Sequence, residues 1–354
     1  MTSIMAPKEK HIFESSGPTH LARLPYIDWN NPHHQRSVAA SLVEGVYALE
    51  YDRRHNSSRL APSWWCYFNF HLEDKLIDNH GTIFCAIYRH NYPLSAPNIP
   101  SYVIAFRGTI LKHVKTMLRD MKANIRCIFN DLHNDSRFER AMGWVEEKVG
   151  LAGARNVWLA GHSLGSAMAL LAGKKMAEMG CPLGTYLFNP PFCSFPTGVA
   201  GSLTKAALSL VVDGRRHHDH FNALSNWYPY IFVNPADPIC SEYITYLEQR
   251  DTMKEIGFGF ELLEMLATQY SLRSQLSCLL GMNFGSEVPR QHLLPSAYLF
   301  KNTGQVPDYK AGLIEIFKLP IRAYKAHKLQ QWWDPYLIPQ CFHYKYKYPT
   351  LQLG

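Results

Sequence analysis

Long apolar runs are missing from this sequence of 354 residues. Its longest apolar-leaning stretch, LTKAALSLVV, is far shorter than the ~20 residues that a membrane-spanning helix needs. The amino-terminal stretch MTSIMAPKEKHIFESSGPTHL carries charge and proline where a secretory signal requires an apolar core of about seven or more residues. We therefore expect neither a membrane span nor a signal peptide.

Closely spaced cysteines are missing as well. The eight cysteines stand far apart, and no two have the two-residue spacing of zinc-binding or thiol-exchange motifs. We expect mostly buried, reduced thiols, which favours an intracellular, cytoplasmic protein over a secreted one. Lys and Arg exceed Asp and Glu by 36 to 29, and the resulting net charge of +7 is only weak evidence for an acidic partner.

Internal repeats, low-complexity tracts and long Gly/Ser/Pro linkers are also absent from the sequence. Each of these would have marked a repeat architecture or a boundary between domains. We therefore expect one domain over residues 1–354, with an N-terminal extension at about 1–30 and an inserted helical segment at about 240–290.

The sequence does contain an alternation of strand-like and helix-like segments. Residues 37–54 place apolar side chains at three- and four-residue steps, which predicts a helix that buries one face, with Ser37 as its N-cap. Short apolar runs bounded by glycine or proline predict strands at 82–88, 102–108, 157–161, 185–191 and 228–237. A helical segment separates the third and fourth runs, and this spacing is typical of a parallel βαβ unit. The predicted fold class is α/β, with a mostly parallel central sheet flanked by helices.

A serine between two glycines stands inside the βαβ unit. Gly161, Ser163 and Gly165 match the Gly-x-Ser-x-Gly turn that places a nucleophilic serine between a strand and a helix. By composition alone this pattern arises in about one chain in ten of this length, so the flanking segments carry the argument. An apolar strand precedes the turn and an Ala-, Leu- and Met-rich helix follows it, which would direct the backbone N–H of Leu164 at an oxyanion. The alternative is that Ser163 only caps that helix.

Candidate partners for a serine nucleophile follow it in the chain. In this fold an orienting carboxylate and then a basic histidine come after the serine. Asp237 follows a strand-like run in a loop flanked by proline, although it is also placed to begin an ordinary Asp-Pro turn. The candidate bases are His292 and His327, and the residues around them do not decide between the two.

A second oxyanion donor is expected ahead of the serine in sequence. The run YVIAFRGT ends in Gly108, where the backbone can approach closely, and in Thr109, whose N–H can donate. The alternative is an ordinary strand-to-helix turn in which Thr109 is the cap.

Three further segments carry weaker signals. Residues 111–126 form a basic amphipathic pattern, either of a docked helix with a solvated face or of a lid that touches a lipid surface. The cluster RRHHDHF at 215–221 sets possible metal ligands side by side, a spacing that seldom lets them converge on one ion. The C-terminal FHYKYKYP interleaves aromatics and lysines without a nucleic-acid-binding fold, which favours an exposed strand edge. We expect no metal, no cofactor and no nucleic acid partner.

These motifs resemble the class 3 lipases, the fungal-type triacylglycerol lipase family of α/β hydrolases, and within it a plant subfamily of lipase-like proteins. The family resemblance rests on VIAFRGT, VWLAGHSLGSAMALLAG, FVNPADPI and AHKLQQWW. The plant subfamily is matched further by FESSGPTHL, LAPSWWCYFNF and LLPSAYLF, so the resemblance covers most of the chain. Some members carry a Gly-Asp-Ser-Leu lipase label, a motif that is absent here.

The resemblance implies roles for individual residues. It implies a nucleophile, an orienting acid and a base in the triad Ser163, Asp237 and His327. It favours His327 because these lipases place the base ahead of an aromatic pair, which here is Trp332 and Trp333. It also implies that Thr109 and Leu164 supply the oxyanion hole.

The expected activity follows from the motifs and the resemblance together. We expect a serine esterase or lipase that cleaves acyl esters, in the first place those of lipids, through an acyl-enzyme, with peripheral contact at a lipid surface. The signal peptides and disulfides of secreted family members are missing, so triglyceride is not the default substrate. The alternative is a hydrolase-fold binding or signalling protein with little or no turnover, because a fold does not fix a function.

Overall fold

The computed structural model describes residues 9–57, 59–91, 98–109, 136–192, 224–255, 293–304 and 321–345. Three features singled out in the sequence lie outside these residues: the amphipathic segment 111–126, the cluster 215–221 and the alternative base His292. The insertion predicted at about 240–290 is described only as far as residue 255, where it is helical.

One mixed sheet organises the described residues, and its eight strands follow one another in chain order. The strands are β1 (Phe70–Ile77), β2 (Ile83–His90), β3 (Tyr102–Phe106), β4 (Val157–His162), β5 (Gly184–Phe188), β6 (Tyr230–Val233), β7 (Ala297–Lys301) and β8 (Gln340–Tyr344). The pairings from β3 through β7 are parallel, and the pairings at the two edges are antiparallel. The predicted α/β class, with a mostly parallel central sheet, is confirmed.

Each of the five predicted strand segments overlaps one strand of this sheet, with ends that differ by at most a few residues. They correspond to β2 through β6, in the predicted order. At the far edge, β8 pairs with β7 alone among the described strands, and four of its five residues are exposed. This confirms the predicted strand edge for the part of FHYKYKYP that the structure describes.

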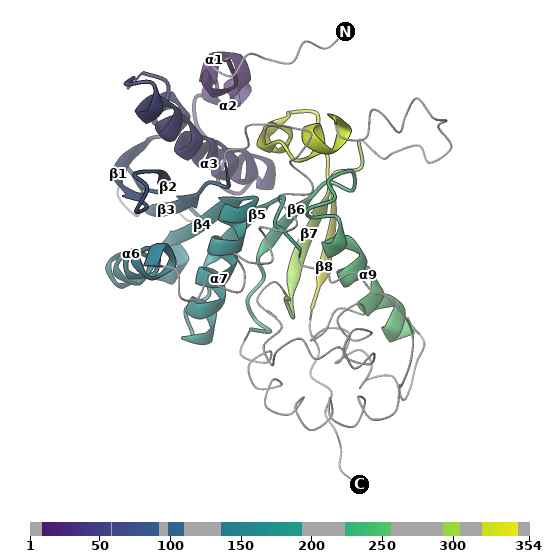
Figure 1. Ribbon diagram of the computed structural model, residues 1–354. Helices are drawn as coiled ribbons and strands as arrows, with labels where there is room; N and C mark the ends of the chain where they lie inside the picture. The colour runs from purple at the N-terminus through teal and green to yellow at the C-terminus, as the bar shows by residue number, and fades with distance from the viewer. Residues whose placement is uncertain are drawn as a thin grey trace.

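Helices cover both faces of the sheet, with α3 (Pro32–Arg54) on one face and α6 (Ser136–Ala152) and α7 (Leu164–Glu178) on the other (Figure 1). The face of α3 also carries α4 (Ser63–Cys66) and η5 (Leu329–Trp333). The remaining elements with defined bounds are η1 (Glu9–His11), α1 (Phe13–Ser16), α2 (Thr19–Ala22), η3 (Ala154–Asn156) and α9 (Glu242–Glu255).

Alternate residues of the central strands enter two different cores. In β4, Val157 and Leu159 pack on the side of α6 and α7, whereas Trp158 and Ala160 pack on the side of α3. All six residues of β4 are buried because both faces of the sheet are covered. This double burial accounts for the continuous apolar runs in the sequence.

The predicted N-cap of the long N-terminal helix is wrong. Helix α3 begins at Pro32, and the Asn31 side chain accepts a hydrogen bond from the His33 N–H at 2.9 Å. Proline suits the first helical position because its missing N–H would have no intrahelical partner there. Ser37 lies in the second turn and is buried. The first turn is polar, so apolar periodicity alone placed the start too late.

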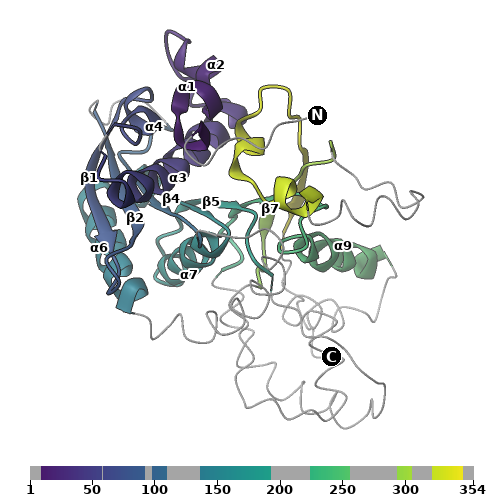
Figure 2. The same ribbon diagram turned by 45° about the horizontal axis from the view of Figure 1, so that its top comes forward.

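The predicted N-terminal extension packs against the rest of the fold over its described part. Phe13, Leu21 and Trp29 are buried in the core on the side of α3. The indole of Trp333 donates to the backbone oxygen of Ser16 at 2.8 Å and so ties this segment to η5. Figure 2 shows α1 and α2 above α3, next to the yellow C-terminal segment.

The cysteines of the described residues are free thiols. Cys85 and Cys240 are buried, but Cys66 and Cys341 are exposed, so the expectation of mostly buried thiols is wrong for these two. Cys66 ends the short helix α4, and Cys341 lies on the edge strand β8. Among the helices of the described ranges, none combines the length and the apolar character needed to cross a membrane.

Candidate active site

Ser163 occupies a sharp turn between β4 and α7, at the carboxyl edge of the sheet. Its backbone has φ 53° and ψ −126°, a left-handed conformation that costs a side-chain-bearing residue of order 1–3 kcal/mol. Its N–H donates to the backbone oxygen of Phe188 on the neighbouring strand at 2.9 Å, which fixes the turn to the sheet. The side chain does not cap α7, so the alternative interpretation of Ser163 as a helix cap is wrong.

The two glycines of the motif are required by contacts of the backbone with itself. A Cβ at Gly165 would overlap the backbone of Phe106 and Arg107 at the end of β3. A Cβ at Gly161 would overlap the backbone of Gly165 and Ser166. The start of α7 is therefore pressed against the ends of two strands, and only hydrogen atoms fit at these positions.

The structure brings Ser163, His327 and Asp237 into one hydrogen-bonded line. The Ser163 Oγ lies 3.0 Å from the His327 Nε2, and the His327 Nδ1 lies 2.8 Å from the Asp237 Oδ2. All three side chains are buried. Because the carboxylate can only accept, the Nδ1 of His327 carries the proton and its Nε2 presents a lone pair to the serine. This arrangement can draw the Ser163 proton onto His327.

The Asp237 carboxylate is surrounded by donors. Its Oδ1 accepts from the Ile239 N–H at 3.1 Å, and its Oδ2 accepts from the Asn189 amide at 2.7 Å and from the Cys240 thiol at 3.2 Å. Burial alone would raise the pKa of Asp237, but the charge and hydrogen bond of His327, with the other donors, bring that pKa below its ordinary value. Asp237 therefore stays ionised while buried. Asp237 also begins a turn with Pro238, because its backbone oxygen accepts from the Ser241 N–H at 2.9 Å, but this turn does not account for the contacts of its side chain with His327 and Asn189.

Asn189, the first residue after β5, joins the acid to the segment that carries the base. Its amide nitrogen donates both to Asp237 and to the backbone oxygen of Ala326, the latter at 3.0 Å. Its side-chain oxygen accepts from the indole of Trp332 at 2.6 Å. Asn189 has φ 47°, a left-handed conformation that asparagine tolerates better than most residues. One side chain thus fixes both ends of the loop around His327.

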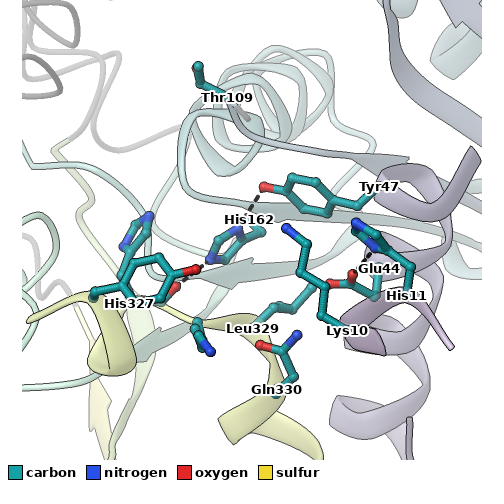
Figure 3. Close-up of a pocket in the computed structure, with 11 residues that line it drawn as sticks. Lys10, His11, Glu44, Tyr47, Thr109, His162, His327, Leu329 and Gln330 are labelled. Atoms are coloured by element: carbon teal, nitrogen blue, oxygen red, sulfur yellow. Dashed lines mark hydrogen bonds and ion pairs between the residues drawn. The ribbon is translucent and has the colours of Figure 1, made fainter. Parts of the chain in front are cut away.

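A second chain of hydrogen bonds runs from the donor loop, Gly108 and Thr109, to the backbone of His327. The Gly108 N–H donates to the Tyr47 hydroxyl at 2.8 Å, and that hydroxyl lies 2.8 Å from the His162 Nδ1. The His162 Nε2 lies 2.8 Å from the backbone oxygen of His327. Since a backbone oxygen only accepts, His162 is protonated at Nε2 and Tyr47 donates to its Nδ1. Figure 3 shows Tyr47 and His162 side by side beneath the donor loop.

His162 is a neutral side chain in this setting. Burial first, and then the neighbouring His327 ring, lower the pKa of His162 to about 3. A neutral imidazole with both nitrogens in use connects Tyr47 to the base and does not itself compete for the Ser163 proton.

The two expected oxyanion donors belong to segments that adjoin the serine. Leu164 is the first residue of α7, where a backbone N–H has no partner within the helix. Thr109 follows Gly108, at which an added Cβ would meet the Ser163 Cβ at 2.8 Å, so the donor loop lies directly against the serine. The Thr109 side chain points away from the two histidines in Figure 3, which leaves its backbone as the group that could serve there.

Sequence reasoning missed Asn189 and Tyr47. Asn189 had a signal, since it is a polar residue at the carboxyl end of a parallel strand, as Ser163 is. Tyr47 had none, because it lies in the middle of a helix in which most side chains are buried. In the part of the chain that the structure describes, no cluster of His, Cys, Asp and Glu is arranged to hold a metal.

Residues 103–197 match the model of the family described as Lipase (class 3). A protein of Arabidopsis thaliana named as a GDSL esterase/lipase is 38% identical to this chain over an alignment of 364 residues, gaps included. The alignment covers 93% of this chain and 96% of that protein. This chain belongs to the class 3 lipase family.

The matched region of this class 3 lipase contains all but the first residue of β3, with the donor loop, β4 and the serine turn. It contains neither Asp237 nor His327. The Gly-Asp-Ser-Leu of the relative's name does not occur here, where residues 161–164 are Gly-His-Ser-Leu. A solved fungal esterase structure from Rhizomucor miehei is 15% identical, with a TM-score of 0.27 over 70% of this chain and 84% of that one. That score is too low to support an inference.

Proposed function

We propose that this protein is a serine hydrolase that cleaves acyl esters, of lipids or of small molecules, through an acyl-enzyme. The observation that carries the proposal is the line from Ser163 Oγ to His327 Nε2 and on to Asp237, with separations of 3.0 and 2.8 Å. Membership of the class 3 lipase family and the name of the Arabidopsis relative support ester hydrolysis as the reaction.

In the first half of the reaction, the Ser163 oxygen attacks the ester carbonyl carbon as His327 Nε2 takes the serine proton. Asp237 holds the Nδ1 proton and stabilises the imidazolium that forms. The carbonyl oxygen becomes an oxyanion, to which the backbone N–H groups of Thr109 and Leu164 donate. The intermediate collapses when the bond to the alcohol breaks, and His327 passes its proton to the departing alkoxide. An acyl ester of Ser163 remains.

In the second half, water takes the place of the alcohol. His327 accepts a proton from the water as the oxygen attacks the acyl carbon, and the same backbone groups stabilise the second oxyanion. The bond to Ser163 Oγ then breaks and the serine recovers its proton from His327. The products are a carboxylic acid and the free enzyme. To reach a lipid substrate, the protein would bind peripherally to the lipid surface that contains it.

Covalent labelling tests the nucleophile directly. A fluorescent alkyl phosphonate reacts with an activated serine, so we expect labelling of the native protein and none of Ser163→Ala. The control is Ser57→Ala, which changes a serine at the end of the turn after α3, away from the triad. Release of p-nitrophenol from acyl esters of increasing chain length then measures turnover and the preferred acyl group.

The outcomes separate an enzyme from a binding protein. Labelling that depends on Ser163, together with ester turnover lost in Ser163→Ala, supports the proposed function. Absence of labelling in protein whose circular dichroism and cooperative melting show it to be folded would sink it. The fold would then act as a binding or signalling module.

A further inference from the structure

A pocket of about 100 Å³ opens beside His327. Its wall includes Thr109 of the donor loop and His162, so it is continuous with the catalytic centre. Residues from the two ends of the chain complete it: Lys10 and His11 come from η1, and Lys328 and Leu329 follow the base. Figure 3 shows these segments facing one another across the pocket.

The charges around this pocket do not balance. Two lysines line it, Lys10 and Lys328, and the single carboxylate in its wall is Glu44. The Glu44 Oε1 already lies 2.9 Å from the His11 Nδ1, and both of these side chains are buried. Within the described residues, neither lysine forms an ion pair with an acidic side chain. The wall therefore presents excess positive charge.

The two lysines differ from ordinary surface lysines in their surroundings. Both are partly buried, and the Lys10 side chain extends into the pocket toward Tyr47 and His162 (Figure 3). The Lys328 ammonium lies 5.0 Å from the centre of the Tyr324 ring. Burial first, then repulsion by Lys10 and Lys325, lower the pKa of Lys328, and attraction by Glu44 opposes this shift only in part. An anion placed between the lysines would relieve this repulsion and replace lost hydration.

We propose that the preferred ester carries an anionic group, a carboxylate or a phosphate, which sits between Lys10 and Lys328 while Ser163 attacks the ester carbonyl. This inference rests on the proposed function and names the substrate class of the same site. The pocket is small beside the roughly 300–1,000 Å³ of pockets that enclose drug-sized ligands, so a compact charged group suits it better than a long acyl chain. A neutral triglyceride offers nothing to these lysines.

Matched pairs of esters test the proposal. The first pair is p-nitrophenyl valerate and the mono-p-nitrophenyl ester of glutaric acid, which share the acyl length and leaving group and differ by a terminal carboxylate. The second pair is monobutyrin and 1-butyrylglycerol 3-phosphate, which differ by a phosphate. For each pair the readout is the ratio of kcat/KM for the anionic ester to kcat/KM for the neutral ester, at low salt.

Variants assign the preference to the two lysines. We expect Lys10→Met with Lys328→Met to lower the ratio by about tenfold or more, mainly through KM, because the charge that meets the anion is gone. Lys10→Arg and Lys328→Arg keep the charge and should retain most of the preference. The control is Lys325→Met, which removes an exposed lysine two residues before the base and outside the pocket wall. Thermal melting confirms that each variant is folded.

The pattern of results identifies the anion or overturns the proposal. If only the glutarate pair shows a preference that depends on the lysines, the anion is a carboxylate. If only the glycerol pair shows it, the anion is a phosphate. If both pairs show it, the site requires a negative charge and does not distinguish the two groups. A ratio that the double Met variant leaves unchanged in both pairs, or that Lys325→Met lowers equally, would overturn the proposal.

A binding measurement keeps this inference separate from the proposed function. Calorimetric titration of Ser163→Ala with monomethyl glutarate, methyl valerate and glycerol 3-phosphate needs no turnover. If the wild-type protein hydrolyses no ester but Ser163→Ala binds an anionic probe only while both lysines are present, the proposed function fails and the anion site stands. If esters are hydrolysed but no anionic probe binds more tightly than methyl valerate, the anion site fails and the proposed function stands.

Discussion

Ser163 and His327 meet at 3.0 Å, yet the fold positions them by different means. Ser163 is held by its own backbone, in a turn of five consecutive residues whose glycines let the start of α7 lie against β4 and the end of β3. His327 is held by side chains from distant parts of the chain, with Asp237 on its ring and Asn189 on the backbone of the residue before it. One catalytic partner is fixed by local backbone geometry and the other by long-range hydrogen bonds.

These two ways of positioning a residue predict sensitivity to different substitutions. The serine turn has no room for an added atom at Gly161 or Gly165, so it responds to steric changes. The segment around His327 is surrounded by polar contacts, so it responds to the loss of single donors or acceptors. Steric substitutions in the serine turn and the removal of polar groups around His327 test this contrast.

Removal of the base should have the largest effect. His327→Ala leaves Ser163 without a proton acceptor, and we expect kcat for p-nitrophenyl esters to fall by about 10⁴-fold. His292→Ala is the matched control, and its kcat should stay within about threefold of wild type. A loss of turnover confined to His292→Ala would overturn the assignment of the base.

A single methyl group should disrupt the serine side. In Gly165→Ala the new Cβ overlaps the backbone of Phe106 and Arg107, so α7 must shift away from β3. We expect kcat/KM to fall by about 10²-fold, because a displacement near 1 Å of a reacting group has about that effect. The free energy of unfolding should fall by about 1–3 kcal/mol in a urea titration.

Gly143→Ala is the matched control for that methyl group. Gly143 lies in α6, is exposed, and has no atom within 4 Å of an added Cβ. The same substitution should stabilise the protein by about 0.4–1 kcal/mol, through helix propensity, and leave kcat/KM unchanged. An equal fall of kcat/KM in Gly165→Ala and Gly143→Ala would contradict the steric explanation of the serine turn.

The contrast between local and long-range positioning also explains what could be predicted from the sequence. The serine turn is a fixed spacing within five residues, so it stands out in the sequence, and Asp237 follows a recognisable strand. His327 could not be chosen over His292 from the residues around them, because the contacts that place it come from Asn189 and Asp237, far away in sequence. Only the family resemblance favoured it.

The same reasoning applies to the fold. The central strands β2 to β6 were predictable because burial on both faces makes them continuously apolar. The start of α3 was not, since Asn31 and Pro32 act through capping and dihedral preference rather than through periodicity. Strand β1 escaped notice because its middle residues are mixed and partly exposed, as suits an antiparallel edge strand.

Loss of one amide should disturb the side of the base. Asn189→Gly keeps a residue that tolerates φ 47° but removes the donors to Asp237 and to the backbone oxygen of Ala326. We expect kcat to fall by about 10- to 100-fold, in line with the loss of groups that orient a catalytic residue. The control is Asn69→Gly, which changes an exposed asparagine with φ 59°. A similar fall in both variants would mean that backbone freedom, and not the amide, matters.

Loss of the Tyr47 hydroxyl should have a smaller effect. Tyr47→Phe breaks the link from Gly108 to His162 without changing the volume of the side chain, and leaves the Gly108 N–H without its acceptor. We expect kcat to fall by about three- to tenfold with little change in KM, which corresponds to about one hydrogen bond. Tyr51→Phe, one turn further along α3, is the control and should match wild type. A normal kcat in Tyr47→Phe would show that His162 positions His327 without the Tyr47 hydroxyl.

The pH dependence of stability should report the charge on Asp237, with the smallest effect. The pKa of Asp237 is lowered in the folded state, so its ionised form stabilises the fold above the unfolded pKa of ~3.9. That contribution is lost as the pH falls from there through the lower folded pKa. Asp237→Asn lacks the titrating group, so its melting temperature should lie below that of wild type at pH 6, and the gap should narrow below about pH 3.9. Circular dichroism melts from pH 7 to pH 3 measure the gap, and a gap of constant size would mean that the network around His327 does not depend on an ionised Asp237.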